Sequence, residues 1–204
     1  MHRCIRYHAL VTPEPVDRID VRFTVNGEAR TLSVAPERML VRTLREDLGL
    51  TGTKEACSIG VCGVCSVLVD GALMSACLVP TVRADGRAVT TVEGLTRSDG
   101  SLSPVQAAFI EHGGLQCGIC TPGQVVAATA LLAEYATPDE HDVREYLTGN
   151  LCRCTGYYGI VASVLAASGA PARAVIRPDV VEVAQVAATA HGVGGDPKPQ
   201  VVSG

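Results

Sequence analysis

Cys57-Ser-Ile-Gly-Val-Cys62-Gly-Val-Cys65 is the stretch that decides the fold, and a fourth cysteine, Cys77, follows it after a short predicted hairpin. The spacing C-x4-C-x2-C with a distant fourth cysteine is that of the ligand run of a plant-type [2Fe–2S] cluster. Such a cluster needs four thiolates around one small inorganic core. Three of them here come from a single loop, which must therefore curl around the core. The glycines between the ligands suit such a loop because glycine tolerates positive φ and close backbone approach.

A second set of four cysteines lies in the C-terminal half of the chain, as Cys117-Gly-Ile-Cys120 and Cys152-Arg-Cys154. Each set is named here by its members: the first quartet is Cys57, Cys62, Cys65 and Cys77, and the second quartet is Cys117, Cys120, Cys152 and Cys154. The quartets account for eight of the nine cysteines, so Cys4 is left over and is predicted to be a free thiol without a role.

Zinc is the main alternative to iron, because C-x2-C pairs commonly bind it. The C-x4-C-x2-C run and the C-x-C pair both depart from the paired C-x2-C spacing, so the spacing favours iron–sulfur. A Rieske site would need two histidines beside the cysteines, and only His112 lies near a quartet, where we interpret it as a solvated helix end. There is no triad, phosphate-binding glycine loop or paired-carboxylate site. We therefore predict no catalytic residue: the chain can move electrons, but it shows no group that would process a substrate.

Composition narrows the remaining possibilities. The chain has 204 residues, a net charge of −4 and 47% hydrophobic residues, which allows one or two small domains. It has no basic block, so nucleic acid and anionic membrane are poor candidate partners. No apolar run reaches the ~18 residues of a membrane span. The N-terminus lacks an apolar signal core and a twin-arginine pair, and nine cysteines without a signal indicate reduced thiols. These features together predict a cytoplasmic protein.

The N-terminal half has the pattern of a small sheet. Alternating apolar residues over 19–25, an Asn26-Gly27 pair and residues 29–34 predict a hairpin with a type I′ turn. Pro36 is predicted to open a helix that ends at Gly49. A second hairpin turns at Asp70-Gly71, and a last strand covers 87–92. Hairpin, helix, ligand loop, hairpin and strand is the order of a β-grasp ferredoxin domain, predicted over residues 18–95 after an irregular arm over 1–17.

The second hairpin places a constraint on the ligands. Strict pairing around Asp70-Gly71 puts Cys77 opposite Val64 rather than Cys65, so the two thiolates would point to opposite faces. The ladder must therefore stop before Cys65.

The C-terminal half changes to helices. Three segments have a hydroxyl residue, then proline, then Gln or Glu at the fourth place, which predicts a capping box at each of three helices: Ser103-Pro-Val-Gln106, Thr121-Pro-Gly-Gln124 and Thr137-Pro-Asp-Glu140. The predicted helices cover about 104–112, 122–135, 138–147 and 157–167. They form a four-helix bundle over residues 96–167, so the fold class is α+β. Each cysteine pair of the second quartet precedes a helix, so two helix N-termini would face one cluster. Residues 168–204 are predicted to be a tail, with a weak helix around 180–190.

The sequence segments around the cysteines closely resemble those of one family, the two-cluster iron–sulfur subunits of the molybdenum hydroxylases (the xanthine dehydrogenase and aldehyde oxidoreductase family). The resemblance covers about residues 19–167 and rests on five stretches: Leu50-Thr-Gly-Thr-Lys-Glu-Ala-Cys57, Cys62-Gly-Val-Cys65-Ser-Val-Leu-Val-Asp-Gly71, Val89-Thr-Thr-Val-Glu-Gly-Leu95, Gln116-Cys-Gly-Ile-Cys-Thr-Pro-Gly123 and Gly149-Asn-Leu-Cys-Arg-Cys-Thr-Gly-Tyr157. The last two stretches are very specific to this family, and they make zinc a much weaker alternative to iron–sulfur.

The resemblance implies roles for the quartets and for two further contacts. The first quartet holds the cluster distal from molybdenum, and the second quartet holds the proximal one. Gln116 matches the glutamine that contacts the molybdopterin cofactor across the subunit boundary, and Cys154 matches the ligand closest to that pterin. A large subunit hydroxylates the substrate at molybdenum, and electrons pass through both clusters to FAD, usually in a medium subunit. A heterotrimer or a dimer of heterotrimers is expected, because this chain is too short for the molybdenum and flavin domains.

Small departures from the family pattern fall in the first ligand loop: Ala56 replaces a usual glycine, Val64 an alanine and Ser66 a threonine. They put no ligand in doubt. Two rival functions remain at this stage. A free-standing two-cluster electron carrier would stay monomeric and cluster-loaded, whereas a structural zinc module would be colourless and redox-silent.

Overall fold

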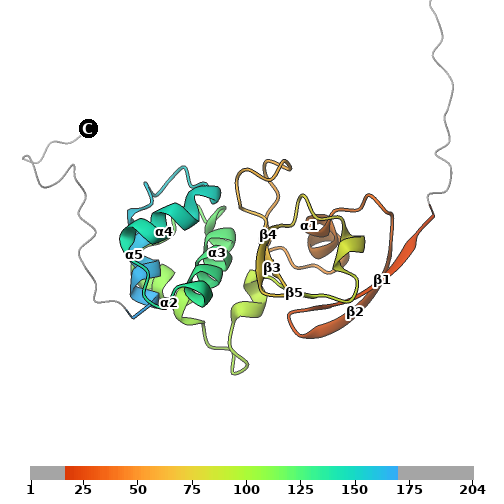
Figure 1. Cartoon of the computed structure of the whole chain (residues 1–204), viewed down its shortest axis with the longest axis horizontal. Helices are drawn as coiled ribbons and strands as arrows, with labels where there is room; N and C mark the ends of the chain where they lie inside the picture. The colour runs from red at the N-terminus through yellow and green to blue at the C-terminus, as the bar shows by residue number, and fades with distance from the viewer. Residues whose placement is uncertain (1–16, 170–204) are drawn as a thin grey trace, which may run out of the picture.

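The computed structural model describes residues 17–169, so Cys4 and almost all of the predicted arm and tail lie outside the described residues. Figure 1 shows two halves side by side, with the strands in the N-terminal half and the longer helices in the C-terminal half. The chain is thus a mixed α+β protein. None of the helices in residues 17–169 is long and apolar enough to cross a lipid bilayer.

The first hairpin forms around the predicted Asn26-Gly27 turn. Strands β1 (Ile19–Val25) and β2 (Glu28–Val34) pair antiparallel, with Val21 opposite Leu32. Asn26 and Gly27 have φ of 53° and 84°, and two consecutive positive φ values are what a type I′ turn requires. The turn and the alternation of apolar residues therefore agree, and every second side chain of β1 from Val21 to Val25 is buried.

Five strands make one mixed sheet in the order β2-β1-β5-β3-β4. β3 (Ser66–Val69) and β4 (Ala72–Ser75) form the second predicted hairpin. β5 (Ala88–Thr90) lies parallel to β1 and antiparallel to β3, which closes the sheet between the two hairpins. This strand is shorter than predicted, because the chain turns into a short 3-10 helix, η3 (Val92–Leu95).

The helix expected from Pro36 begins later than predicted. α1 (Leu40–Arg42) continues as a π-helical turn, η1 (Thr43–Asp47). Pro36 and Glu37 form a turn instead, and Met39 is extended because it bridges to Pro80 while the Leu40 amide donates to the Val79 carbonyl at 2.7 Å. Leu40, Val41 and Leu44 are buried in the core of the sheet half. A short 3-10 helix, η2 (Thr81–Ala84), follows this contact.

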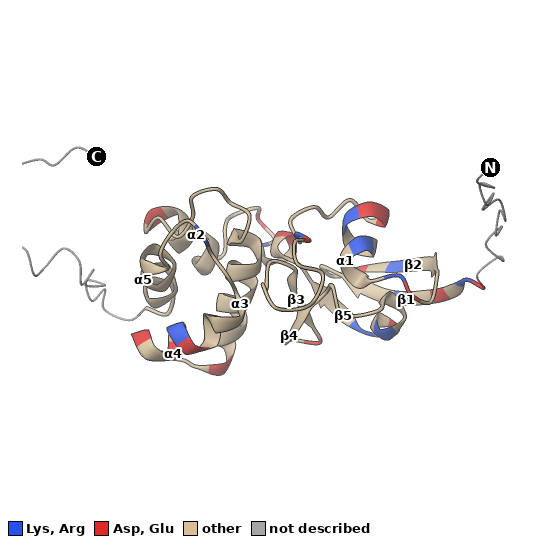
Figure 2. Ribbon diagram, turned by 90° about the horizontal axis from the view of Figure 1, so that it is seen from above, with Lys and Arg blue, Asp and Glu red and all other residues tan. Residues whose placement is uncertain are grey.

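Between residues 96 and 169 there are four α-helices and one short 3-10 helix: α2 (Pro104–Glu111), α3 (Thr121–Glu134), α4 (Glu140–Tyr146), η4 (Leu147–Gly149) and α5 (Tyr158–Ala167). They share a second apolar core, with Phe109, Leu131, Ile160 and Val164 among its most buried members. α3 is buried along most of its length, as its nearly continuous apolar sequence predicts. Figure 2 shows acidic and basic segments side by side on the continuous α1–η1 segment and on α4.

Only one of the three predicted capping boxes exists. Ser103 and Gln106 cap α2 reciprocally, as predicted. The box at Thr121 is wrong: Cys120 is the N-cap of α3, and Gln124 is buried with its amide donating to the Asn150 carbonyl at 2.5 Å. The box at Thr137 is also wrong, because Asp139 takes the N-cap of α4 and pairs with Asp142. A distant carbonyl takes the Gln124 side chain in the first case, and the neighbouring Asp139 takes the cap in the second.

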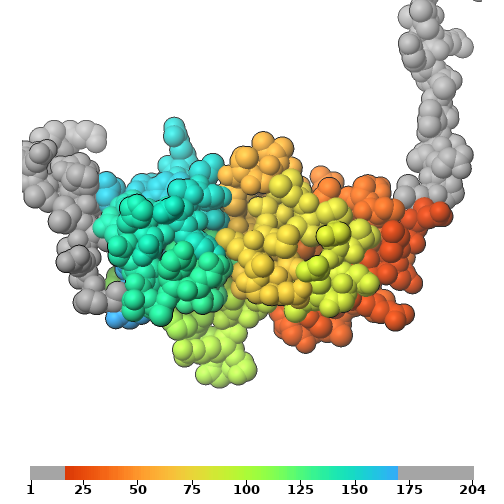
Figure 3. Space-filling model, in the orientation of Figure 1, coloured from red at the N-terminus to blue at the C-terminus, as the bar shows by residue number. Residues whose placement is uncertain are grey.

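The two halves meet along α3, which packs against β3 and β4 (Figure 1). Figure 3 shows the yellow and orange strand half in direct contact with the green helical half along this face. The approach is close at Gly123 in the first turn of α3. A Cβ atom there would lie 2.2 Å from the Gly63 carbonyl oxygen, inside the first ligand loop. This contact therefore requires glycine and brings the second quartet's helix against the first quartet's loop.

Candidate metal centres

The first ligand loop, residues 57–65, curls as its glycines predict. Gly60 and Gly63 have φ of 78° and 68°. Backbone amides of the loop point inward: those of Ile59, Val61 and Cys62 donate to Cys57. These donors, the Ile59 amide first, lower the pKa of Cys57 to about 6. A loop of this kind favours negative charge at its centre, which suits thiolates and an inorganic sulfide core.

The first quartet is assembled as two pairs. Cys57 adjoins Cys62, and Cys65 adjoins Cys77. The strand ladder ends at Ser66 and Ser75, as the register argument predicted, and one further bond joins the Ala76 amide to the Cys65 carbonyl at 3.2 Å. Both sulfurs of the second pair are buried, and burial is the largest of the effects that raise the pKa of Cys65 to about 12.

The second quartet is also assembled as two pairs. The Cys117 and Cys154 sulfurs lie 3.5 Å apart and are exposed, whereas Cys120 contacts Cys152 and is buried. Burial raises the pKa of Cys120 to about 12. The Ile119 amide is the first cause that lowers the pKa of Cys117, and the Cys117 sulfur raises that of Cys154. Cys120 stands at the N-terminus of α3, and Cys154 lies four residues before α5, so both predicted helix starts adjoin the quartet.

The arrangement of the cysteine sulfurs in pairs indicates which metal group the quartets can hold. A single zinc ion holds four sulfurs at about 2.3 Å, which places them about 3.8 Å from one another. Within residues 17–169, no three cysteine sulfurs lie within 4.8 Å of one another. Two separate pairs in each quartet match a core with two metal atoms, each bound by one pair of thiolates. The donor sets therefore fit two [2Fe–2S] clusters better than two zinc ions.

The ligand loops of the two quartets are bonded to each other. The Leu151 amide, next to Cys152, donates to the Cys62 carbonyl at 2.9 Å. Asn150 is buried, and its side-chain nitrogen donates to the Gly63 carbonyl at 3.0 Å and to the Ser66 hydroxyl at 3.2 Å. Sequence reasoning missed Asn150, although it stands inside the motif 149–157. Its role depends on a loop 87 residues earlier.

A second missed group surrounds Cys152. The Thr155 hydroxyl lies 3.1 Å from the Cys152 sulfur, and the Tyr157 hydroxyl accepts a hydrogen bond from the Cys152 amide at 2.8 Å. Burial acts to raise the pKa of Cys152, but hydrogen bonds led by the Thr155 hydroxyl outweigh it and lower the pKa. Tyr157 has φ of 69°, which is uncommon for a residue other than glycine. Thr155 and Tyr157, the polar residues after the C-x-C pair, were the sequence signal that could have pointed to this group.

The predicted pterin contact, Gln116, is exposed beside Cys117. Its neighbours Leu115 and Ile119 are also exposed, at 39% and 53%. Gln116 and the Cys117–Cys154 pair are therefore all accessible at the second quartet. Gln124, three residues into α3, is by contrast fully buried and cannot reach this surface.

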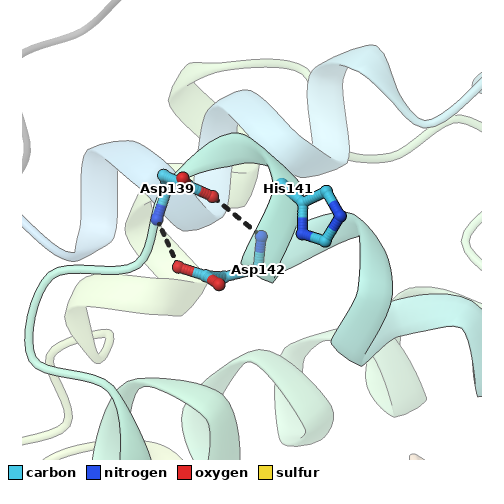
Figure 4. Close-up of side chains that lie close together, drawn as sticks. All are labelled: Asp139, His141 and Asp142. Atoms are coloured by element: carbon cyan, nitrogen blue, oxygen red, sulfur yellow. Dashed lines mark hydrogen bonds between the residues drawn. The ribbon is translucent and has the colours of Figure 1, made fainter.

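One further cluster of possible metal ligands lies on α4, outside the quartets. Figure 4 shows Asp139, His141 and Asp142 close together. The two carboxylates accept the amide hydrogens of each other's residues, which makes them the capping box of α4. His141 points toward Glu145, at 3.7 Å. These bonds account for the cluster without a metal ion.

Comparisons with known proteins agree with this geometry. Residues 23–92 match the family described as "2Fe-2S iron-sulfur cluster binding domain", and residues 91–165 match the "[2Fe-2S] binding domain" family. The chain is 48% identical over 151 residues to a probable xanthine dehydrogenase subunit of Bacillus subtilis, covering 74% of this chain and 86% of that protein.

Two further relatives are equally informative. The nicotine 6-hydroxylase small subunit of Paenarthrobacter nicotinovorans is 49% identical over 160 residues, which is 78% of this chain and 96% of that protein. The solved structure of quinoline 2-oxidoreductase from Pseudomonas putida 86 superposes with a TM-score of 0.72 at 43% identity, over 75% of this chain and 95% of the matched chain. The chain therefore belongs to the iron–sulfur small subunits of the molybdenum hydroxylases, the xanthine dehydrogenase and aldehyde oxidoreductase family, and its role is electron transfer.

Proposed function

We propose that this chain carries electrons from a molybdopterin centre on a large partner subunit to FAD on a medium subunit, through a [2Fe–2S] cluster in the second quartet and then one in the first. In this proposal the first quartet lies in a β-grasp ferredoxin domain, residues 18–95, and the second in a four-helix bundle, residues 96–167. Substrate chemistry takes place on the large subunit, and no residue of this chain is catalytic.

The observation that carries this proposal is the open side of the second quartet. Cys117 and Cys154 are exposed, whereas Cys65 and Cys77 in the first quartet are buried. Electron transfer between centres needs close approach, so the exposed pair marks the side where electrons enter. Gln116 stands on that side and donates or accepts hydrogen bonds through its amide, which suits a polar heterocycle such as the pterin. In this assignment Cys154 is the cluster ligand nearest to the pterin.

Exposed apolar side chains support a partner at each end. Beside the second quartet lie Ile110, Leu115 and Ile119, at 64%, 39% and 53% exposure. Beside the first ligand loop lie Ile59, Val61 and Leu78, at 66%, 57% and 55%. Clusters of exposed apolar residues mark interaction surfaces. We assign the first patch to the large subunit and the second to the FAD subunit, in a heterotrimer or a dimer of heterotrimers.

The bonded ligand loops provide the internal route. The hydrogen bond from the Leu151 amide to the Cys62 carbonyl joins a residue adjacent to one quartet's ligand directly to a ligand of the other. The eight cysteines of the quartets form no disulfide, which suits a reducing compartment and supports a cytoplasmic location.

The test uses the native complex, purified through a tag on this chain. The molybdenum centre is reduced by a pulse of one electron. The visible absorbance of the clusters then gives the rate at which the electron reaches them. We expect Gln116→Ala to slow this step while iron content stays unchanged, because the pterin loses its contact beside Cys117. Thr31→Ala, an exposed polar position on β2, is the control and leaves the rate unchanged. A wild-type rate in Gln116→Ala would remove its assigned role, and absence of molybdenum from the purified complex would remove the proposal.

A further inference from the structure

The turn after the last ligand of the second quartet holds one hydroxyl against one sulfur. Thr155 Oγ1 lies 3.1 Å from Cys152 Sγ and 3.1 Å from the Tyr157 backbone nitrogen. The Tyr157 amide can only donate, so it takes a lone pair of the hydroxyl oxygen. The hydroxyl hydrogen is then free to point at the sulfur. A thiolate is an acceptor without a hydrogen of its own, so this is the direction that a ligated Cys152 imposes.

The surrounding turn keeps Thr155 in this position. Gly156 and Tyr157 both have positive φ, 62° and 69°, and the tyrosine adopts this conformation without the freedom of a glycine. A residue other than glycine is disfavoured in this region and persists where its surroundings hold it. Here the Tyr157 hydroxyl accepts the Cys152 amide hydrogen at 2.8 Å, which closes the turn onto the ligand. The strained turn and the two hydrogen bonds are therefore one arrangement.

A hydrogen bond to a ligand sulfur has a defined effect on a bound cluster. Reduction adds negative charge, part of which falls on the sulfurs, so a donor stabilises the reduced form more than the oxidised form. The backbone donors to Cys152 are present with any side chain at position 155, whereas the hydroxyl donor is specific to threonine or serine.

Resting on the proposed function, in which the second quartet holds a [2Fe–2S] cluster, we propose that Thr155 is a positioning residue that sets the reduction potential of that cluster by donating its hydroxyl hydrogen to the Cys152 sulfur. The hydroxyl makes the second quartet's cluster a better electron acceptor. In the described hydrogen bonds Thr155 contacts Cys152 and Tyr157 and no residue of the first ligand loop, so the other cluster is unaffected. Tyr157 fixes the turn that holds the hydroxyl in place.

The test compares Thr155→Val with Thr155→Ser in the tagged native complex, by redox titration with both cluster signals followed by electron paramagnetic resonance. Valine keeps the shape and loses the donor. A hydrogen bond to a charged acceptor supports a change of about tenfold in the equilibrium constant for reduction. For one electron this is a fall of about 59 mV in midpoint potential. We expect this fall at the second quartet's cluster alone, with Thr155→Ser returning it toward the wild-type value.

Three results would overturn the inference. They are an unchanged potential in Thr155→Val, an equal fall at both clusters, or a fall in Thr155→Ser as large as in Thr155→Val. If valine prevents cluster loading, Thr155→Ala provides the donor-free variant, with the same expected fall and the same contradicting results. Wild-type protein without iron in the second quartet would instead overturn the proposed function, and this outcome is separate because it is seen before any variant is titrated.

Discussion

Replacing Asn150 by alanine removes the side chain that bonds the two ligand loops together. Its nitrogen makes two hydrogen bonds across the interface, to the Gly63 carbonyl at 3.0 Å and to the Ser66 hydroxyl at 3.2 Å. Each neutral hydrogen bond contributes about 1 kcal/mol net, so their loss costs about 2 kcal/mol. The Gly63 carbonyl keeps the Ser66 amide and hydroxyl as donors, so no acceptor is left unpaired.

The space left by the buried carboxamide adds up to about 1 kcal/mol. The total of about 2–3 kcal/mol corresponds to a change of about 30- to 160-fold in the unfolding equilibrium. Asn150→Asp should cost more than alanine at neutral pH. The carboxylate keeps the shape but places an acceptor, and a charge, against the Gly63 carbonyl in a buried position.

The assay is urea unfolding of the cluster-loaded protein, followed by far-ultraviolet circular dichroism and by visible absorbance. Thr148→Ala is the matched control, because it removes an exposed side chain that bonds only the nearby Glu145 carbonyl in the described hydrogen bonds. It should stay within about 0.5 kcal/mol of the wild type. Wild-type stability in Asn150→Ala, or equal stability of the alanine and aspartate variants, would refute the role of these hydrogen bonds.

Three further predictions follow from the same contacts. Gly123→Ala should lower the unfolding free energy by about 1–3 kcal/mol, because its Cβ would lie 2.2 Å from the Gly63 carbonyl oxygen; a loss no larger than that of Ala133→Gly would contradict the close approach. Cys57→Ser should abolish the spectroscopic signal of the first quartet's cluster and keep the other, and loss of both in a folded protein would argue against independent sites. Burial and a hydrogen bond to Glu134 raise the pKa of Tyr146 to about 12. Because the unfolded phenol ionises first, the free energy of unfolding should fall as the pH rises from about 10 to 12. Tyr146→Phe should remove this slope in a pH series of unfolding curves, and an unaltered slope would assign it elsewhere.

Local signals in the sequence predicted the local structure well. The Asn26-Gly27 and Asp70-Gly71 turns have positive φ at both residues, and each turn fixes the register of its hairpin. The same register argument placed the end of the ladder at Ser66. Such predictions succeed because the interacting groups lie within a few residues of one another.

Predictions failed where a distant segment competes for the same backbone or side chain. The helix expected from Pro36 starts at Leu40 because the preceding residues pair with the segment around Pro80. The capping role expected for Gln124 is lost because its amide reaches the Asn150 carbonyl. No periodicity or spacing reports these contacts, since they exist only after the two halves meet.

The same contrast between sequence-local signals and long-range contacts holds for the candidate site. The cysteine spacing predicted both quartets as ligand sets, and the structure brings each quartet together in pairs. Asn150 and Thr155 were not singled out, because asparagine and threonine are common in turns and have no ligand spacing of their own. Their roles come from what they contact, which is the opposite ligand loop for Asn150 and a ligand sulfur for Thr155.

The most direct test of the account is an analysis of metal, acid-labile sulfide and flavin in this protein, purified natively with the chains that bind it. The account predicts about four iron and about four sulfide per chain, the content of two [2Fe–2S] clusters, with molybdenum and flavin in the accompanying chains. Iron and sulfide in a monomer without molybdenum would favour a free electron carrier. Zinc in place of iron would contradict the central claim.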